Sequence, residues 1–193
     1  MRQITLRLIV MIQFLLFFCL LIGCDIFKTR DPESPELPRS NYVPATTPDI
    51  LIQNFINSFK DKVQENYISC FSEKKFIFAP SAESASKFSF LLNWTLQDER
   101  QYFNNLINQV PQNSEISLKF LNEQKNFYGD SSSYSAIYSL SVPFIDAQKP
   151  KYYQGSLHFV CTKDQNNQWV ISNWQDIKDE KYPSWSELKG RLN

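Results

Sequence analysis

Apolar and polar side chains alternate along the second half of the chain. Between Tyr134 and Phe144 every second residue is apolar, and serines fill most of the positions between them. This period of two is typical of a half-buried β-strand, and residues 115–120, 152–161 and 168–174 carry it as well. Long strands separated by loop-length gaps predict an antiparallel meander after the second helix.

The first half of the chain shows helical spacing instead. Residues 47–49 combine an N-cap threonine, a proline for the first helical position and an acid for the first turn. The pattern predicts a helix that runs to about Ser69 and bends near residues 60–62. Its apolar face is formed by Leu51, Phe55, Phe59, Val63 and Tyr67.

A second helix is predicted to begin at Thr95, where Asp98 stands in the capping-box position, and to be ended by Pro111. Between the two helices, residues 74–80 predict a short strand closed by its final proline. Helical segments ahead of a sheet indicate an α+β domain. The apolar face of the second helix consists of Phe103, Leu106, Ile107 and Val110.

The order of these elements resembles that of the NTF2-like superfamily, which includes the SnoaL-like proteins. Residues 55–71 resemble the opening helix pair of that family, and residues 169–176 resemble its closing strand. The resemblance spans residues 48–178. It implies an α+β fold in which N-terminal helices pack on a strongly curved, mainly antiparallel sheet shaped as a cone. Residues 179–193 form a C-terminal extension, predicted to pack back as a short helix through Trp185 and Leu188.

The amino-terminal pattern is that of a signal peptide. Arg2 and Arg7 precede an apolar run of 16 residues that ends at Gly23. As a helix this run would rise only about 24 Å, less than the roughly 30 Å of a hydrocarbon core, which disfavours a permanent membrane span. The residues that follow favour a lipoprotein signal peptide. The alternatives are a plain secretory signal peptide and a short membrane anchor.

Residues 21–24, Leu-Ile-Gly-Cys, resemble the lipobox of bacterial lipoproteins. The resemblance implies that a signal peptidase removes residues 1–23 and that Cys24 is the lipid attachment site, a stable membrane anchor once it carries two or three acyl chains. The expected location is the cell envelope, on the periplasmic or outer side of a bacterial membrane, and Asp25 leaves inner or outer membrane open. Residues 24–47 hold the lipidated cysteine and a proline-rich tether with too few apolar side chains to order itself.

Charge excludes one class of partner. Arg2 and Arg7 are removed with the signal peptide, so the mature chain keeps 18 of the 20 basic side chains and has 20 acidic ones. A net charge near −2 offers no broad attraction to nucleic acid, and no purely basic run exceeds two residues. The expected partners are the membrane through Cys24 and either a small apolar ligand or an envelope protein, and a homodimer is left open.

Cysteine usage predicts neither a metal site nor a redox motif. Cys70 and Cys161 are the two cysteines of the exported domain. An oxidising envelope permits a disulfide between them, and two separately buried thiols are the favoured alternative because the sequence carries no distance. These cysteines and the single histidine have no metal-ligand spacing, and no glycine-rich phosphate loop is present. We therefore expect no metal and no cofactor.

The sequence offers no catalytic set. His158 falls on the polar face of its strand, and Asp146 is expected in a turn. Enzymes of the family that this chain resembles use an aspartate, tyrosine or histidine inside the cone, and none of those positions can be matched here. An acid and a tyrosine or histidine converging in an apolar pocket would nevertheless favour an enzyme.

Aromatic residues are abundant, with 16 Phe, 9 Tyr and 4 Trp. Most are explained by core packing, while Tyr102, Tyr138 and Trp174 are candidates for lining a ligand cavity in the cone. The sequence thus favours a non-catalytic, membrane-anchored binding module. A structural assembly lipoprotein and a small isomerase, dehydratase or hydrolase are the alternatives.

Overall fold

The computed structural model describes residues 41–193, together with Arg7 and Gln13. The predicted signal peptide, the lipid attachment residue Cys24 and most of the predicted tether lie outside the described residues. Residues 41–193 belong to one compact unit. In the part of the chain that is described, no helix has both the length and the apolar character needed to cross a membrane.

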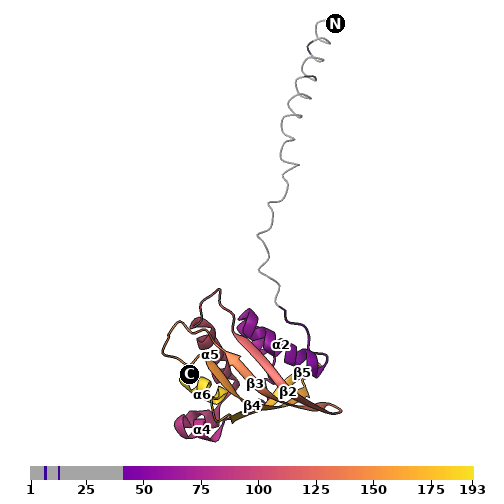
Figure 1. Ribbon diagram of the computed structural model, residues 1–193. Helices are drawn as coiled ribbons and strands as arrows, with labels where there is room; N and C mark the ends of the chain where they lie inside the picture. Colours follow the sequence, from indigo (N-terminus) through magenta and orange to yellow (C-terminus); the bar gives the residue numbers. More distant parts are fainter. Residues whose placement is uncertain (1–6, 8–12, 14–40) are drawn as a thin grey trace. The chain divides into compact units, whose positions relative to one another are not determined.

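A five-stranded mixed sheet forms one side of this unit (Figure 1). Its order is β1-β5-β4-β3-β2, and the last four strands along the chain form the predicted antiparallel meander. The first strand pairs parallel with β5 at one edge. The strands are β1 (Ile77–Ala79), β2 (Ser117–Tyr128), β3 (Ser131–Ser141), β4 (Tyr152–Lys163) and β5 (Trp169–Lys178).

The alternation in the sequence becomes the two faces of the sheet. Along β3, Tyr134, Ala136 and Tyr138 are buried, whereas the intervening positions are half-buried. Its neighbour β4 buries Tyr153, Leu157, Phe159 and Cys161 in the same way. The period-two pattern therefore predicted the strands and their inner face correctly.

Two irregularities bend the meander. The register of β2 against β3 shifts between Leu121 and Gln124, where Asn122 has a φ of 54°, and the register of β4 against β5 shifts at Val160 and Cys161. Bulges of this kind bend a strand and increase its twist. The result is the curved, mainly antiparallel sheet that the resemblance implied, so the α+β fold class is confirmed.

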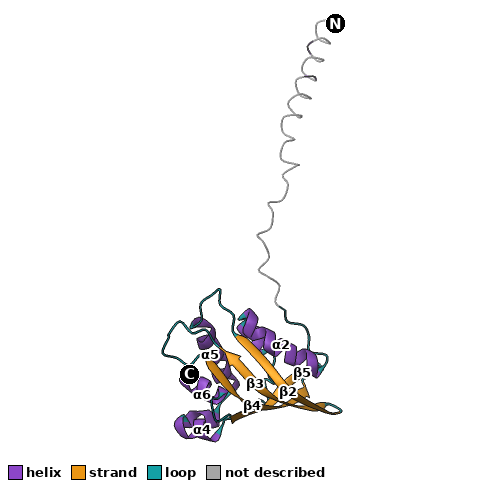
Figure 2. Cartoon of the chain, in the orientation of Figure 1, coloured by secondary structure: helices purple, strands orange, loops and turns teal. Residues whose placement is uncertain are grey.

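The helices pack against the sheet (Figure 2). Thr47 caps the first of them by accepting a hydrogen bond from Ile50 N, and the predicted bend falls at Lys62, which has a φ of 54°. Thr95 and Asp98 form the predicted capping box. The helices are α2 (Pro48–Asp61), α3 (Gln64–Ile68), α4 (Ala82–Lys87), the 3₁₀ helix η2 (Ser89–Asn93), α5 (Leu96–Asn108) and α6 (Trp185–Leu192).

Both ends of the described segment contact the domain. Ala45, which the sequence assigns to the tether, is buried, and its carbonyl accepts a 2.8 Å hydrogen bond from Trp169 N. At the other end, Trp185 and Leu188 of α6 are fully buried. The segment interpreted as an extension therefore contributes helix α6 to the core.

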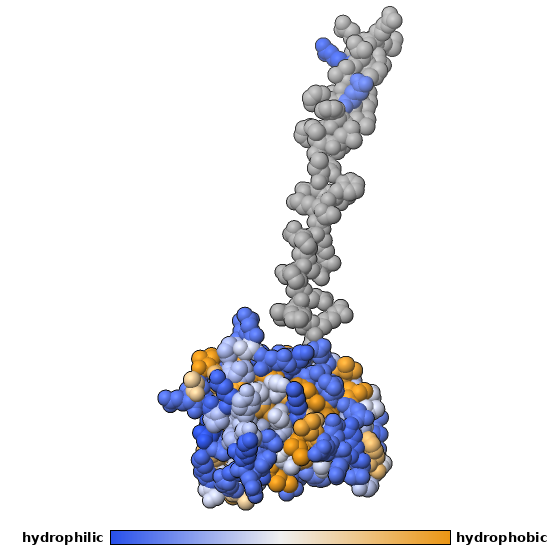
Figure 3. Space-filling model, in the orientation of Figure 1, coloured by the Kyte–Doolittle hydropathy of each residue, from blue (hydrophilic) through white to orange (hydrophobic). Residues whose placement is uncertain are grey.

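The core is dominated by aromatic rings. Phe55 lies at its centre, with Phe159 and Trp174 in edge contact at centroid distances of 5.4 and 5.7 Å. Trp174 and Trp185 meet edge to face at 4.8 Å. The outside differs, because the face seen in Figure 3 is largely hydrophilic with small separate apolar patches.

Candidate functional site

An acid and a tyrosine meet inside the cone. Asp176 of β5 is buried, and its Oδ1 accepts a 2.8 Å hydrogen bond from Tyr138 Oη. Its Oδ2 accepts hydrogen bonds from Ser186 N at 2.7 Å and from Ser186 Oγ. Tyr138 Oη in turn accepts a 2.7 Å bond from Trp185 N. This pair therefore binds the first N–H groups of α6, which have no acceptor within their own helix.

Burial controls the protonation of this pair. It raises the pKa of Asp176, although the hydrogen bonds from Ser186 and Tyr138 oppose that effect. Burial also raises the pKa of Tyr138 well above its ordinary value. The phenol therefore keeps its proton and donates a hydrogen bond to the Asp176 carboxyl group. Gly155 makes room for the contact, because a Cβ there would stand 2.6 Å from Tyr138 Oη.

A second buried charge cluster lies on α5 and α6. Glu99 Oε2 accepts 2.6 Å hydrogen bonds from Trp94 Nε1 and from Lys189 Nζ, and Oε1 accepts one from Tyr67 Oη. Both charged side chains are fully buried. Burial lowers the pKa of Lys189 to about 8, against the opposing attraction of Glu99. Below that pH the site holds an ammonium group in the protein interior.

The first turn of α6 is tied to α4 as well. Ser184 is the N-cap of α6, and its Oγ lies 3.2 Å from the hydroxyls of both Ser81 and Ser84. Ser81 N also donates to Ser186 Oγ at 3.0 Å. All four serines are buried. The helix is therefore held at its start by a satisfied polar network.

The three residues predicted to line a ligand cavity lie in this packed interior. Tyr102, Tyr138 and Trp174 have no exposed surface. Trp185 of α6 occupies the space between them, donating a 2.9 Å hydrogen bond from Nε1 to Tyr102 Oη and contacting Trp174. They therefore do not line an open cavity, because α6 fills the cone.

Sequence reasoning missed two members of the interior. Glu99 has the position of an ordinary first-turn acid, and Lys189 sits in a polar-looking tail. Neither position carries a local signal, since the two residues are 90 positions apart in the chain. Asp176 lies in the segment interpreted as the closing strand, and the tail is predicted to pack back as a short helix, but the contact between the two is not predicted.

The two domain cysteines are buried free thiols. Burial raises the pKa of Cys161 to about 12, and burial followed by the charge of Cys161 raises that of Cys70. Thiols of this kind are poor nucleophiles at neutral pH. They therefore add no reactive group to the interior.

The remaining sequence candidates have structural roles. His158 is half-buried on the outer side of β4, and its Nδ1 lies 2.8 Å from Ser135 Oγ. Asp146 is exposed and accepts a hydrogen bond from Gln148 N at 2.9 Å, as expected for a turn. Among the described residues, no group of three or more His, Cys, Asp or Glu side chains could hold a metal ion.

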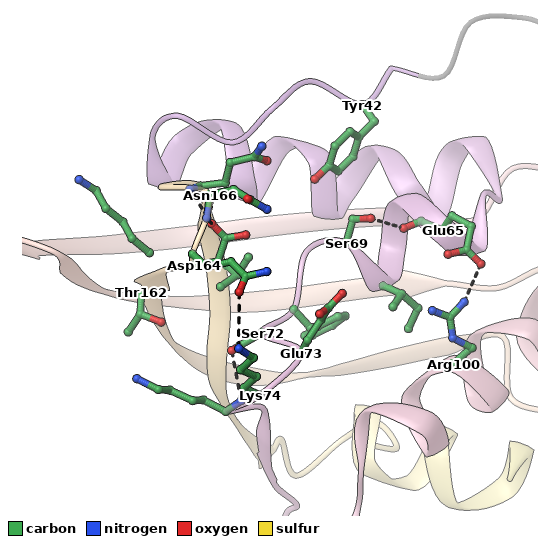
Figure 4. Close-up of a pocket in the computed structure, with 17 residues that line it drawn as sticks. Tyr42, Glu65, Ser69, Ser72, Glu73, Lys74, Arg100, Thr162, Asp164 and Asn166 are labelled. Carbon is green, nitrogen blue, oxygen red and sulfur yellow. Dashed lines mark hydrogen bonds and ion pairs between the residues drawn. The ribbon is translucent and has the colours of Figure 1, made fainter.

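A cleft of about 420 Å³ lies outside the cone, where α3, the loop after it and the β4-β5 hairpin meet (Figure 4). Glu65 and Arg100 form an ion pair of 2.6 Å at one end. Asp164 stands at the other end, where its Oδ1 accepts from Asn166 N and Gln168 N at 2.8 Å. The volume falls within the range of ordinary ligand sites.

Both signs of charge line this polar cleft. Its acidic side chains are Glu65, Glu73 and Asp164, and its basic ones are Lys74, Lys75, Lys163 and Arg100. Figure 4 shows Glu73 and Lys74 on the same loop, with Tyr42 on the opposite side. Such a lining suits a polar partner that carries both charges better than a small apolar ligand.

Comparison with known proteins identifies the fold but no family. No protein-family model matches the chain, and no curated protein sequence matches it. A conserved protein from Planctomyces limnophilus is similar in structure, with a TM-score of 0.53 and 7% identity, over 67% of this chain and 91% of that one. A protein from Novosphingobium aromaticivorans, named provisionally as a scytalone dehydratase, gives a TM-score of 0.51 and 10% identity over 66% and 78%.

A nuclear transport factor 2 (NTF2-like) superfamily protein from Salmonella enterica gives a TM-score of 0.49 and 13% identity, over 68% of this chain and 87% of that one. At such identities structural likeness establishes fold alone. Helices against a curved, open, five-stranded mixed sheet make this an α+β domain with the NTF2-like fold.

Proposed function

We propose that this protein is a lipid-anchored lipoprotein of the bacterial cell envelope whose NTF2-like domain is a non-catalytic binding module. The anchor rests on the lipobox-like residues 21–24 and the proline-rich segment behind Cys24. The binding role rests on the cleft between α3 and the β4-β5 hairpin, the polar cleft described above. The partner it fits is a polar segment of another envelope protein.

The observation that carries the non-catalytic assignment is the filling of the cone by α6. Asp176 and Tyr138 do converge, which is the arrangement that would favour an enzyme. Their polar atoms, however, are hydrogen-bonded to Trp185 and Ser186. A catalytic acid or base needs a substrate atom within about 3 Å, and α6 occupies that place.

The anchor is tested by Cys24→Ser expressed with a radiolabelled fatty acid. Serine has no thiol to alkylate, so we expect loss of label and accumulation of unprocessed precursor. Continued acylation and cleavage at the same place would contradict the lipoprotein assignment.

The polar cleft is tested with a photo-crosslinking residue placed at Lys74 in cells that express the protein. We expect a defined protein adduct that weakens when Glu73→Lys changes the charge beside the probe. The matched control is the same probe at Lys119, an exposed lysine of β2 away from the cleft. Equal adducts at both positions, or none at Lys74, would argue against the cleft.

The enzyme alternative is tested on the purified full chain with hydroxy-carbonyl substrates that can lose water. We expect no turnover. Turnover that disappears in Asp176→Asn while the circular dichroism spectrum is kept would overturn the non-catalytic assignment.

A further inference from the structure

The ammonium group of Lys189 lies in a box of aromatic rings. Its Nζ stands 3.6 Å from the centroid of the Trp174 ring and 3.7 Å from that of Phe78. The rings of Trp94 and Tyr102 follow at 5.6 Å each. All four distances fall within the range in which a ring quadrupole attracts a cation, and the attraction is strongest when water is excluded. We call these four rings the aromatic box.

Acidic groups complete the box. Glu99 Oε2 accepts a hydrogen bond from Lys189 Nζ at 2.6 Å, and the buried carboxyl group of Asp176 also acts electrostatically on this lysine. Lys189 is the one lysine with a buried side chain in residues 41–193. Glu99 is therefore the direct counter-charge of the Lys189 ammonium group, and Asp176 adds a weaker attraction.

The hydrogen bonds also favour an alkylated ammonium group. A lysine Nζ has three N–H donors, and the described residues give Lys189 Nζ a single acceptor, Glu99. The other directions are occupied by ring faces, which interact as well with methyl-substituted nitrogen as with N–H groups. In addition, Trp174 Nε1 is a buried donor without an acceptor among the described residues.

An acidic depression lies on the surface next to Asp176, outside the aromatic box. It has a volume of about 790 Å³, and Asp176 is among its lining residues. Asp179 and Glu180 lie beside it, whereas the one cation of its lining, Lys178, is paired with Glu83. A cationic ligand would be attracted to this surface.

We propose that the cone of this protein is a binding site for an alkylammonium group, and that Lys189 of α6 occupies it from within the chain. An external ligand binds in competition with Lys189 and displaces α6. This goes beyond the proposed function, since it concerns another place and another chemistry than the polar cleft. The polar cleft and the cone can therefore fail independently as binding sites, while the non-catalytic assignment refers to the cone with α6 in place.

The first test uses the full chain in detergent with Lys189→Gly, which empties the box of its cation. n-Butylammonium, the equivalent of the deleted side chain, is expected to raise the unfolding temperature by about 3–5 °C at ten times its dissociation constant, relative to sodium chloride of equal strength. The neutral analogue 1-butanol is expected to produce no comparable rise.

Two variants control this result. Lys189→Gly combined with Glu99→Gln removes the acid that binds the cation, so n-butylammonium should no longer raise the unfolding temperature. Lys189→Met fills the box without a charge and should also show no rise. Equal stabilisation of Lys189→Gly by 1-butanol and n-butylammonium, or none by either, would overturn the proposal.

A second measurement decides the matter if Lys189→Gly does not fold. Amide hydrogen exchange of residues 185–192 in the unaltered chain is followed with tetramethylammonium chloride or sodium chloride. Faster exchange of α6 with the ammonium salt alone supports displacement of the helix. Equal exchange in the two salts overturns the proposal.

Discussion

The cone interior and the polar cleft use charged side chains in opposite ways. In the interior, Glu99 and Lys189 are both fully buried and in contact with hydrogen-bond donors and aromatic rings. In the cleft, the Glu65–Arg100 pair has the same 2.6 Å distance, yet Glu65 is 71% exposed. Equal distances do not mean equal interaction energies, because water screens the exposed Glu65–Arg100 pair and is excluded from the buried Glu99–Lys189 pair.

This difference in exposure decides where a partner or ligand can form a new contact. Interior charges are bound by the protein's own helix α6, so a ligand has to compete with that helix. Cleft charges are exposed to solvent, so a partner can reach them without any rearrangement. Substitutions in the interior should therefore change stability more than substitutions in the cleft.

The largest effect is expected from Glu99→Gln. The amide keeps the shape of the side chain and leaves the Lys189 ammonium buried without its counter-charge, which costs about 3–5 kcal/mol of unfolding free energy. Urea unfolding followed by tryptophan fluorescence measures it. A loss below about 1 kcal/mol would mean that the interior pair behaves like a surface pair.

The pH dependence of Lys189 is expected next in size. Its pKa is about 8 in the folded chain and 10.5 in its ordinary state, so between these values the unfolded chain binds the proton that the folded chain has lost. Unfolding free energy therefore rises with pH in this window, by on the order of 3 kcal/mol at most, relative to a chain without this lysine.

Lys189→Met provides that reference, because every other titrating group is common to the two proteins. The difference in unfolding free energy, wild type minus variant, should increase from pH 8 to pH 10.5 and be level below pH 8. A flat difference across the window would show that Lys189 titrates as a solvated lysine.

Gly190→Ala is expected to loosen α6. A Cβ at this position would collide with the ring of Phe88, and overpacking of this kind costs about 2 kcal/mol. Amide hydrogen exchange of residues 185–192 should accelerate. Gly129→Asn is the control, since its Cβ meets nothing within 4 Å and asparagine tolerates the φ of 63°. Unchanged exchange in Gly190→Ala would contradict the tight docking of α6.

The smallest effect is expected from Glu65→Gln in the cleft. It breaks the ion pair with Arg100, and for a pair so exposed the loss of unfolding free energy should stay below about 1 kcal/mol. The same urea measurement compares it directly with Glu99→Gln. A loss as large as that of the interior variant would remove the distinction between the two regions.

The sequence alone determined the elements that depend on near neighbours. The caps at Thr47 and Thr95, the break at Lys62 and the inward face of β3 all follow from residues within a few positions of each other. Local hydrogen bonds and the period of the backbone decide such features, so a linear pattern contains them. The α+β class and the resemblance to the NTF2-like fold follow from the order of the same elements.

The residues that occupy the cone depend on contacts between distant parts of the chain. Tyr102, Tyr138 and Trp174 are predicted to line a ligand cavity, but their neighbours in the structure are Trp185 and Lys189, which come from a helix beyond the expected end of the fold. Glu99 accepts a hydrogen bond from Lys189, 90 positions further along the chain, and Asp176 accepts one from Ser186, 10 positions further along. Contacts of this kind depend on how far each element reaches over the folded sheet, and no period or spacing in the sequence records that distance.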